Sequence, residues 1–250
     1  MLKKTINLIF FFFFYFVEMS YSYNAGYSCG FEPYPDVQKV HLESGRKIFS
    51  SENTDLIWSF DFQGKLYGKI TILQEKEPRL IFEYLDVKQT CSLKSVNPLL
   101  VECWIGELND DNKPDIILVF AGYGCGMASE LTDVIFILSK KDKYSFAGIK
   151  TIGFGTEDVI HLNNDKKPEI VHSEFIYGKS ANNKQSHNYW VYTVLNIHEN
   201  ELCVSQAYPQ KWIQYKSHNN HSSAICLSNE DKAKLWNEQH SSFFLKLSDK

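Results

Sequence analysis

The chain has 250 residues and a formal net charge of −4, and it contains no block of Lys and Arg that could neutralise a row of phosphates. Nucleic acid is therefore not an expected partner, because such binding depends on basic side chains that face the backbone. Hydrophobic residues make up 44% of the sequence, which is enough for one ordinary domain with a sizeable core.

The N-terminus has the pattern of a secretory signal peptide. Lys3 and Lys4 precede an almost unbroken apolar run from Ile6 to Val17, and the small-residue pattern Ser20-Tyr21-Ser22 follows it. The run is shorter than the roughly 20 residues that span a bilayer, so we expect cleavage after Ser22 and no membrane span in the mature chain. Residues 23–250 are then a single-domain protein that is secreted or periplasmic.

All six cysteines lie in this mature part, where an oxidising compartment would allow up to three disulfide bonds. The sequence leaves the pairing open. Two local pairs are favoured: Cys91 with Cys103, across the turn-like Asn97-Pro98, and Cys203 with Cys226 near the C-terminus. The alternative is that some of these residues are buried thiols.

From Asp55 onward, short runs rich in Val, Ile, Phe, Tyr and Trp alternate with clusters of Gly, Pro, Asn, Asp and Lys. No long helical pattern separates the runs, so the main body is predicted to be all-β and mostly antiparallel. One short helix is predicted near the C-terminus, where Ser228 can cap and Asp231 follows three residues later. The predicted strands are 56–60, 65–73, 80–87, 99–105, 116–120, 134–138, 144–152, 159–160, 169–176, 189–197 and 201–207.

An acidic, proline-containing loop occurs twice. Its first copy is GELNDDNKPDI at Gly106–Ile116, and its second is VIHLNNDKKPEI at Val159–Ile170, 54 positions further along. The matched pairs are Glu107 with His161, Leu108 with Leu162, Asn109 with Asn163, Asp111 with Asp165, Lys113 with Lys167, Pro114 with Pro168 and Asp115 with Glu169.

The first copy has the layout of a calcium-binding loop. Calcium takes about six to eight oxygen ligands, and a loop can supply them from positions 1, 3, 5 and 9 together with a backbone carbonyl. These positions are held by Glu107, Asn109, Asp111 and Asp115, with Lys113 giving its carbonyl. Asn112 stands at the sixth position, which usually turns with a positive φ. The alternative is an Asx-rich turn that satisfies its own backbone without an ion.

The second copy is a weaker candidate. It keeps Asn163, Asp165 and Glu169, but His161 takes the first position and Lys166 the sixth. Imidazole is a poor ligand for a hard cation, and a left-handed Lys would cost roughly 1–2 kcal/mol.

The first loop, from Glu107 to Ile116, resembles the calcium loop of FG-GAP and VCBS repeats, whose usual form is D-x-N-x-D-G-x-x-D before a hydrophobic strand. Phe154-Gly155, ahead of the second loop, looks like the Phe-Gly element of that family. The resemblance covers at most residues 99–207. Glu107 and Asn112 depart from the usual Asp and Gly, no Phe-Gly precedes the first loop, and neither copy has the Gly-Ala-Pro element.

The resemblance implies four-stranded blades of a β-propeller, in which each loop joins the first two strands of a blade. The corresponding units are 55–98, 99–152 and 153–207, followed by a C-terminal extension at 208–250. Propellers usually close with about four to eight blades. The architecture is therefore left open between a ring with a hidden fourth blade, a compact β-sandwich-like body and an assembly of copies.

Other candidate chemistry is weaker. Gly26–Gly30 matches G-x-S-x-G, and Gly122–Gly126 has the look of a phosphate cradle, but neither is followed by the helix that such sites need. His161, His172 and Glu174 lack a recognised ligand spacing. We therefore expect a non-catalytic protein that binds a protein or glycan. The alternative is a secreted hydrolase whose histidines and carboxylates converge only in three dimensions.

Overall fold

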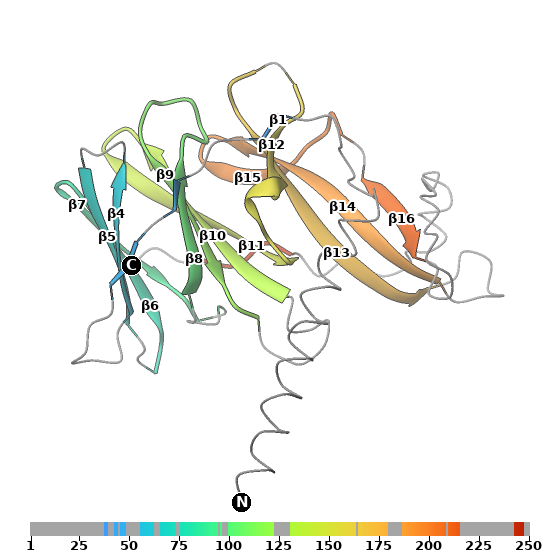
Figure 1. The fold of residues 1–250 in the computed structure, drawn as a ribbon, viewed down its shortest axis with the longest axis horizontal. Coiled ribbons are helices and arrows are strands. Elements are labelled where there is room, and N and C mark those ends of the chain that lie inside the picture. The colour runs from blue at the N-terminus through green and yellow to red at the C-terminus, as the bar shows by residue number, and fades with distance from the viewer. Residues whose placement is uncertain are drawn as a thin grey trace, which may run out of the picture.

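Antiparallel strands account for nearly all of the described chain in a computed structural model (Figure 1). The structure describes residues 38–39, 43–44, 46–48, 56–62, 66–73, 76–94, 96, 100–122, 131–163, 165–179, 187–208, 210–215 and 243–247. The prediction of an all-β, antiparallel fold is confirmed. The signal peptide and the helix expected after Ser228 lie outside the described residues.

The strands form three sheets, each built on a meander of four consecutive strands. The first sheet contains β4 (Leu56–Phe62), β5 (Leu66–Leu73), β6 (Arg79–Tyr84) and β7 (Val87–Ser92). The middle sheet contains β8 (Leu100–Gly106), β9 (Asp115–Phe120), β10 (Leu131–Lys140) and β11 (Lys143–Ile152). The last sheet contains β12 (Val159–His161), β13 (Glu169–Lys179), β14 (His187–His198) and β15 (Glu201–Val204), and β16 (Lys211–Tyr215) also pairs with β14. A 3₁₀ turn, η2 (Thr156–Asp158), precedes β12. The meanders fall inside the units 55–98, 99–152 and 153–207.

The third and fourth strands of every meander are joined by a tight turn of the same length. Two residues separate the paired strand ends in each hairpin. Leu85, Lys141 and Glu199, the first residues of these turns, have φ values of 51°, 48° and 49°, and Asn200 has a φ of 66°. Positive φ values suit the twist of adjoining antiparallel strands, which explains why these short connections recur.

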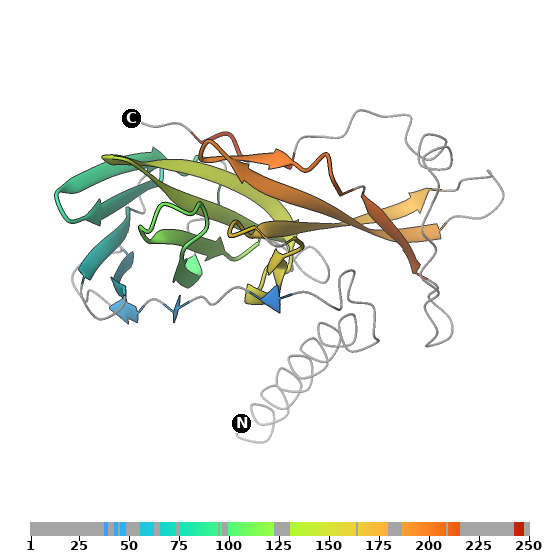
Figure 2. The ribbon, with the colours of Figure 1, turned by 90° about the horizontal axis from the view of Figure 1, so that it is seen from above.

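A single N-terminal segment adds one short strand to each sheet. β1 (Gln38–Lys39) pairs with β12, β2 (Glu43–Ser44) with β8 and β3 (Arg46–Ile48) with β4, always antiparallel. The partner is thus the opening strand of each meander. The three blue strands lie in a line along one side of the molecule in Figure 2.

The opening strand pairs of the middle and last meanders share their register. Gly106 pairs with Asp115 in the middle sheet, and Ile160 pairs with Glu169 in the last sheet. Both partners are shifted by the same 54 positions that separate the two loops in the sequence. The two acidic loops therefore connect equivalent pairs of strands.

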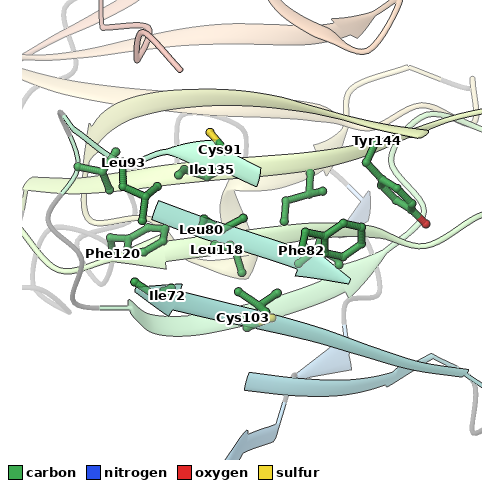
Figure 3. Close-up of a cluster of buried hydrophobic side chains, with 14 of the residues drawn as sticks. Ile72, Leu80, Phe82, Cys91, Leu93, Cys103, Leu118, Phe120, Ile135 and Tyr144 are labelled. Carbon is green, nitrogen blue, oxygen red and sulfur yellow. The ribbon is translucent and has the colours of Figure 1, made fainter. Parts of the chain in front are cut away.

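The middle sheet is packed on both faces, which is why every residue of β9 is buried. Ile116 and Leu118 point into one core, and Ile117 and Val119 point into the other. The three sheets form a row in the described residues, with the first and last sheets on opposite sides of the middle one (Figure 1). The first core joins the first and middle sheets and includes Ile72, Leu80, Phe82, Cys91, Leu93, Cys103, Leu118, Phe120, Ile135 and Tyr144 (Figure 3). The second core joins the middle and last sheets and includes Trp104, Leu108, Ile117, Val119, Phe136, Ile149, Phe154, Ile170 and Leu195.

Cys91 and Cys103 are buried thiols of the first core and do not form the local bridge that we expected. Cys91 lies on β7 and Cys103 on β8, so the two strands belong to different sheets and the side chains fill separate places in the core (Figure 3). Burial raises the pKa of Cys103 to about 12. Cys203 is an exposed thiol, and its expected partner Cys226 lies outside the described residues.

Candidate functional site

The first acidic loop runs from the end of β8 to the start of β9. It turns sharply, with φ values of 63° at Asp110 and 60° at Asn112. The positive φ predicted for Asn112 is confirmed. Asn and Asp tolerate the left-handed region better than most residues, which explains their presence at these two positions.

Asp115 is the most deeply placed carboxylate of this loop and has no exposed surface. Its Oδ2 accepts a hydrogen bond from the Leu108 amide at 2.7 Å, and its Oδ1 accepts one from the Ser139 amide at 2.7 Å. The side chain therefore ties the loop to the neighbouring strand β10. Burial raises the pKa of Asp115 to about 7, although these two amides favour the charged form.

Asp111 and Glu107 lie beside this group. The Oδ1 atom of Asp111 accepts from the Lys113 amide at 2.9 Å, and its Oδ2 accepts from the Ser139 hydroxyl at 2.7 Å. The Asp111 amide in turn donates to Glu107 Oε1 at 3.0 Å. Burial raises the pKa of Glu107, and the nearby charge of Asp111 adds to this rise. Three carboxylates thus share one small region.

Asn109 supplies an amide oxygen to the same region. Its Nδ2 donates to the Ser139 carbonyl at 2.8 Å, so the side chain is held in place. Its Oδ1 is buried and has no hydrogen-bond partner among the described residues. A buried oxygen without a partner is costly, and a cation or a water molecule would satisfy it.

Lys113 behaves differently from the other predicted ligands. Its ammonium group donates to the carbonyl of Lys141, in the turn between β10 and β11. The side chain therefore links the loop to this hairpin, and the backbone carbonyl of Lys113 stays a predicted ligand.

The fit to calcium is partial. The donors Glu107, Asn109 and Asp111 offer oxygen only, which suits a hard cation. The oxygens of Asp111 already accept protein hydrogens, however. Among the described residues, no three His, Cys, Asp or Glu side chains are gathered closely enough to hold a metal ion in the observed geometry.

The second loop repeats the core of this arrangement. Glu169 Oε2 accepts from the Leu162 amide at 2.9 Å, as Asp115 does from Leu108. Asp165 Oδ1 accepts from the Lys167 amide at 2.9 Å, as Asp111 does from Lys113. The two repeated hydrogen bonds lie at positions shifted by 54, so the loops share these two contacts.

The loops differ at the positions that matter for a cation. Asn163 donates its Nδ2 to Glu169 Oε1 and is exposed, so it leaves no buried oxygen. The left-handed conformation considered for Lys166 is not adopted, since Lys166 is not among the residues with positive φ. Lys166 Nζ lies 3.7 Å from Asp110 Oδ1, which places an ammonium group beside the first loop.

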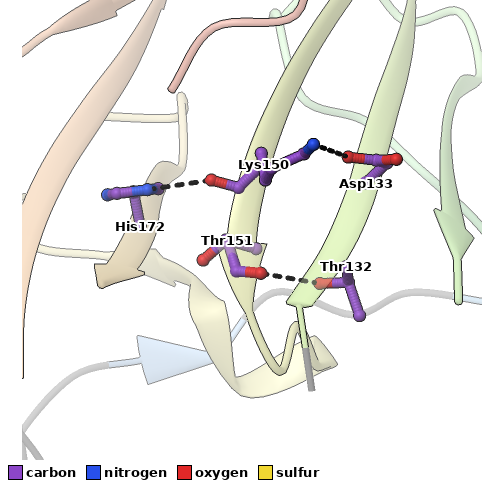
Figure 4. Close-up of polar contacts among 5 residues, drawn as sticks. All are labelled: Thr132, Asp133, Lys150, Thr151 and His172. Carbon is purple, nitrogen blue, oxygen red and sulfur yellow. Dashed lines mark hydrogen bonds and ion pairs between the residues drawn. The ribbon is translucent and has the colours of Figure 1, made fainter. Parts of the chain in front are cut away.

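The histidines considered for the hydrolase alternative have structural surroundings. His172 is buried, its ring stacks on Phe243 at 3.9 Å, and its Nε2 lies 3.0 Å from the Lys150 carbonyl. Because a carbonyl can only accept, Nε2 carries the proton (Figure 4). His161 lies on β12 opposite Gln38 of β1.

A buried polar network surrounds the His172 contact and joins the middle and last sheets. The Ser173 amide donates to Thr151 Oγ1 at 3.0 Å, and that hydroxyl lies 3.1 Å from the Ser173 carbonyl. The Ser173 hydroxyl donates to the Ile152 carbonyl at 2.7 Å. These groups provide hydrogen-bond partners for backbone atoms at the edge of β11, which is a structural role. Burial raises the pKa of Glu174, which follows Ser173 on β13.

The two glycine motifs contribute no described site. Residues 26–30 and 123–126 lie outside the described residues. Gly122 is described, and a Cβ there would lie 1.6 Å from the Leu131 carbonyl oxygen. Glycine at this position is therefore explained by close backbone approach.

Sequence reasoning missed Ser139 and Asn200. Ser139, on β10, bonds to Asp111, Asp115 and Asn109 through its hydroxyl, amide and carbonyl. The Nδ2 of Asn200, in the turn between β14 and β15, donates to the same carbonyl at 2.6 Å. No motif marks either residue, because their positions depend on pairing between distant strands.

In comparisons with known proteins, no family model, no curated protein and no solved structure matches the chain. In the described part of the chain, no helix has the length and apolar character of a membrane span.

Proposed function

We propose that this chain is an exported, non-catalytic β-repeat protein, divergent from the FG-GAP and VCBS repeats, with a structural calcium site in its first loop. The observations that carry the calcium site are three acidic side chains of one loop, Glu107, Asp111 and Asp115, and the buried Oδ1 of Asn109, which has no hydrogen-bond partner among the described residues. Burial raises the pKa of both Glu107 and Asp115, so their ionised forms are disfavoured without a counter-charge. A bound cation would supply that charge.

The second loop is proposed to be a structural copy without a cation. Its amide-bonding pattern matches that of the first loop, but its Asn163 oxygen accepts the Asp165 amide at 2.8 Å. The side chains of Asn163 and Asp165 are also more exposed than their counterparts in the first loop. Each of these features lowers the need for a counter-ion.

A binding role fits the use of the buried polar groups better than catalysis does. The His172 ring and the Ser173 hydroxyl are committed to edge carbonyls of β11. Asp115 is committed to two backbone amides. Groups held in this way stabilise the sheets and are not poised to exchange protons with a substrate. The proposed partner is a protein or a glycan, in a secreted or periplasmic setting.

The calcium site can be tested by titration calorimetry and thermal unfolding of the mature chain after treatment with a chelator. Calcium should bind at one site and raise the melting temperature, because a ligand of the folded state stabilises it by mass action. Asp111→Asn should weaken binding by about tenfold or more, while Asp165→Asn, its counterpart in the second loop, should leave it unchanged. Absence of binding heat together with an unchanged melting temperature would remove calcium from the proposal.

The binding role needs a separate test, because it could hold without calcium. The mature chain would be offered to a panel of immobilised glycans and to secreted proteins of its source, in parallel with assays for ester, peptide and glycoside hydrolysis. Saturable binding without turnover is expected. Turnover that is abolished by His172→Gln, with the fold intact by circular dichroism, would favour the hydrolase instead.

A further inference from the structure

A short apolar segment near the C-terminus pairs with β11, the outermost strand of the middle sheet, through an isolated bridge. Residues 243–247 read Phe-Phe-Leu-Lys-Leu. The Leu245 amide donates to the Gly148 carbonyl, and the Lys150 amide donates to the Phe243 carbonyl, each at 2.8 Å. An isolated antiparallel bridge lies between these two bonds. The segment therefore contacts β11 as an extended peptide does when it extends a sheet.

The side chains of this segment divide between the two cores. Phe243 and Phe244 pack against the second core, and their rings are 4.5 Å apart. Leu245 and Leu247 pack against the first core. Lys246 alone is exposed. Four of the five positions thus carry side chains that pack on a core, while the backbone pairs with β11.

Gly148 on β11 leaves space for the side chains of this segment. A Cβ at Gly148 would lie 2.9 Å from Leu245 Cδ1 and 3.1 Å from Leu247 Cδ1, so the missing side chain makes room for both leucines. The His172 ring stacks on the Phe243 ring, with an angle of 18° between the ring planes. Gly148, His172 and the backbone of β11 thus contact residues 243–247, and we call the place that they border the groove.

We propose that this groove, formed by β11, Gly148 and His172, is a peptide-binding site for an extended Phe-Phe-Leu-x-Leu segment, and that residues 243–247 are its resident ligand. The segment is joined to β16 only through residues 216–242, and its inter-strand hydrogen bonds go to β11. These backbone hydrogen bonds are of the kind that a separate extended peptide makes with a strand edge. The proposal is independent of the calcium site and of the partner proposed above.

The test uses the full mature chain with a specific protease site inserted within residues 216–242, in buffer with chelator. After cleavage, the C-terminal fragment should stay with the body on size exclusion. A labelled synthetic peptide of residues 240–250 should then exchange into the groove, followed by fluorescence anisotropy. Phe243→Asp in the peptide should weaken its binding by about tenfold or more, and Lys246→Ala should change it by less than about twofold.

Two outcomes would overturn the proposal. The body could retain its β-sheet circular dichroism and yet fail to bind the peptide. Alternatively, it could unfold when the resident fragment leaves, which would make the segment an integral part of the core.

A second measurement tests the groove without protease cleavage. In the uncut chain, Gly148→Val should fill the floor of the groove and accelerate hydrogen exchange at the Leu245 amide, while the Leu118 amide of β9 stays protected. Lys143→Val, on the same strand but outside the groove, is the matched control and should leave both rates unchanged. Equal protection of Leu245 in the Gly148→Val variant and in the parent chain would also count against the groove.

Discussion

Replacing Asp115 by Asn should change stability in opposite directions at acid and alkaline pH. The carboxyl is fully buried, and burial raises its pKa to about 7 from an unfolded value near 4. An acid whose pKa is higher in the folded state gives stability that is complete below the unfolded pKa and is lost as the pH rises through the folded pKa. The parent chain should therefore lose stability from this group between about pH 4 and about pH 7.

The size of the stability change in Asp115→Asn follows from the pKa shift of Asp115 and from its two hydrogen bonds. A shift of about 3 pKa units corresponds to about 4 kcal/mol, an upper figure that needs little screening correction because the side chain is buried. Asn cannot ionise, so it avoids this loss. Its amide nitrogen, however, must face either the Leu108 or the Ser139 amide, and an unsatisfied buried donor costs about 1–3 kcal/mol. The variant should be neutral or less stable at acid pH and more stable at alkaline pH.

Urea unfolding in chelator at about pH 4.5 and about pH 8.5 measures this difference. The Asp115→Asn change should be about 3 kcal/mol more favourable at the higher pH, because other groups titrate equally in both proteins. Glu83→Gln is the control, and its effect on stability should change with pH in the opposite direction. A hydrogen bond from Lys88 lowers the pKa of this partly exposed carboxyl, so its small contribution to stability is lost as the pH falls. An Asp115→Asn effect that is the same at both pH values would refute a raised pKa in the folded protein.

Three further outcomes follow from local geometry. Asn112→Gly should be neutral or slightly stabilising, whereas Asn112→Val should cost about 1–2 kcal/mol because φ is 60°; equal melting temperatures for the two variants would contradict the left-handed turn. Phe154→Ala should cost about 3–5 kcal/mol in urea unfolding, since the ring lies among Trp104 and Phe136 in the second core, and a loss below about 1 kcal/mol would be inconsistent with that packing. In the native protein an alkylating reagent should modify the exposed Cys203 and leave buried Cys103 intact, as mass spectrometry would show; rapid modification of Cys103 would argue against its burial.

The sequence contains enough local information for the strands and for the repeated loop. The strand Arg79–Tyr84 has one buried face, and the run Ile116–Phe120 is apolar because both faces of β9 are covered. The 54-residue spacing of the loops reappears as the same register in the opening strand pairs of two meanders.

What the sequence could not provide is the pairing of distant segments. Ser139 joins the loop because β10 lies beside β9, and no local pattern specifies that neighbour. The strands at 38–48 are two or three residues long, so their periodicity is too short to read. Cys91 and Cys103 are close in sequence, but the sheet boundary falls between them and sends each into its own strand. Sequence separation was therefore a poor guide to their pairing.

The pairing pattern of β1, β2 and β3 sets an order of assembly. β3 pairs with the nearby β4, β2 with β8 and β1 with the distant β12, so successive contacts enclose ever longer stretches of chain. Closing long loops is slow, because the chain loses conformational entropy before the new contact contributes any stabilising energy. The N-terminal segment is synthesised first yet must wait for residue 161 before its outermost pair can form. We expect this segment to pair first at β3 and last at β1, in the last slow phase of folding. Until then the edges of β4, β8 and β12 stay unpaired and prone to aggregation in the newly made chain.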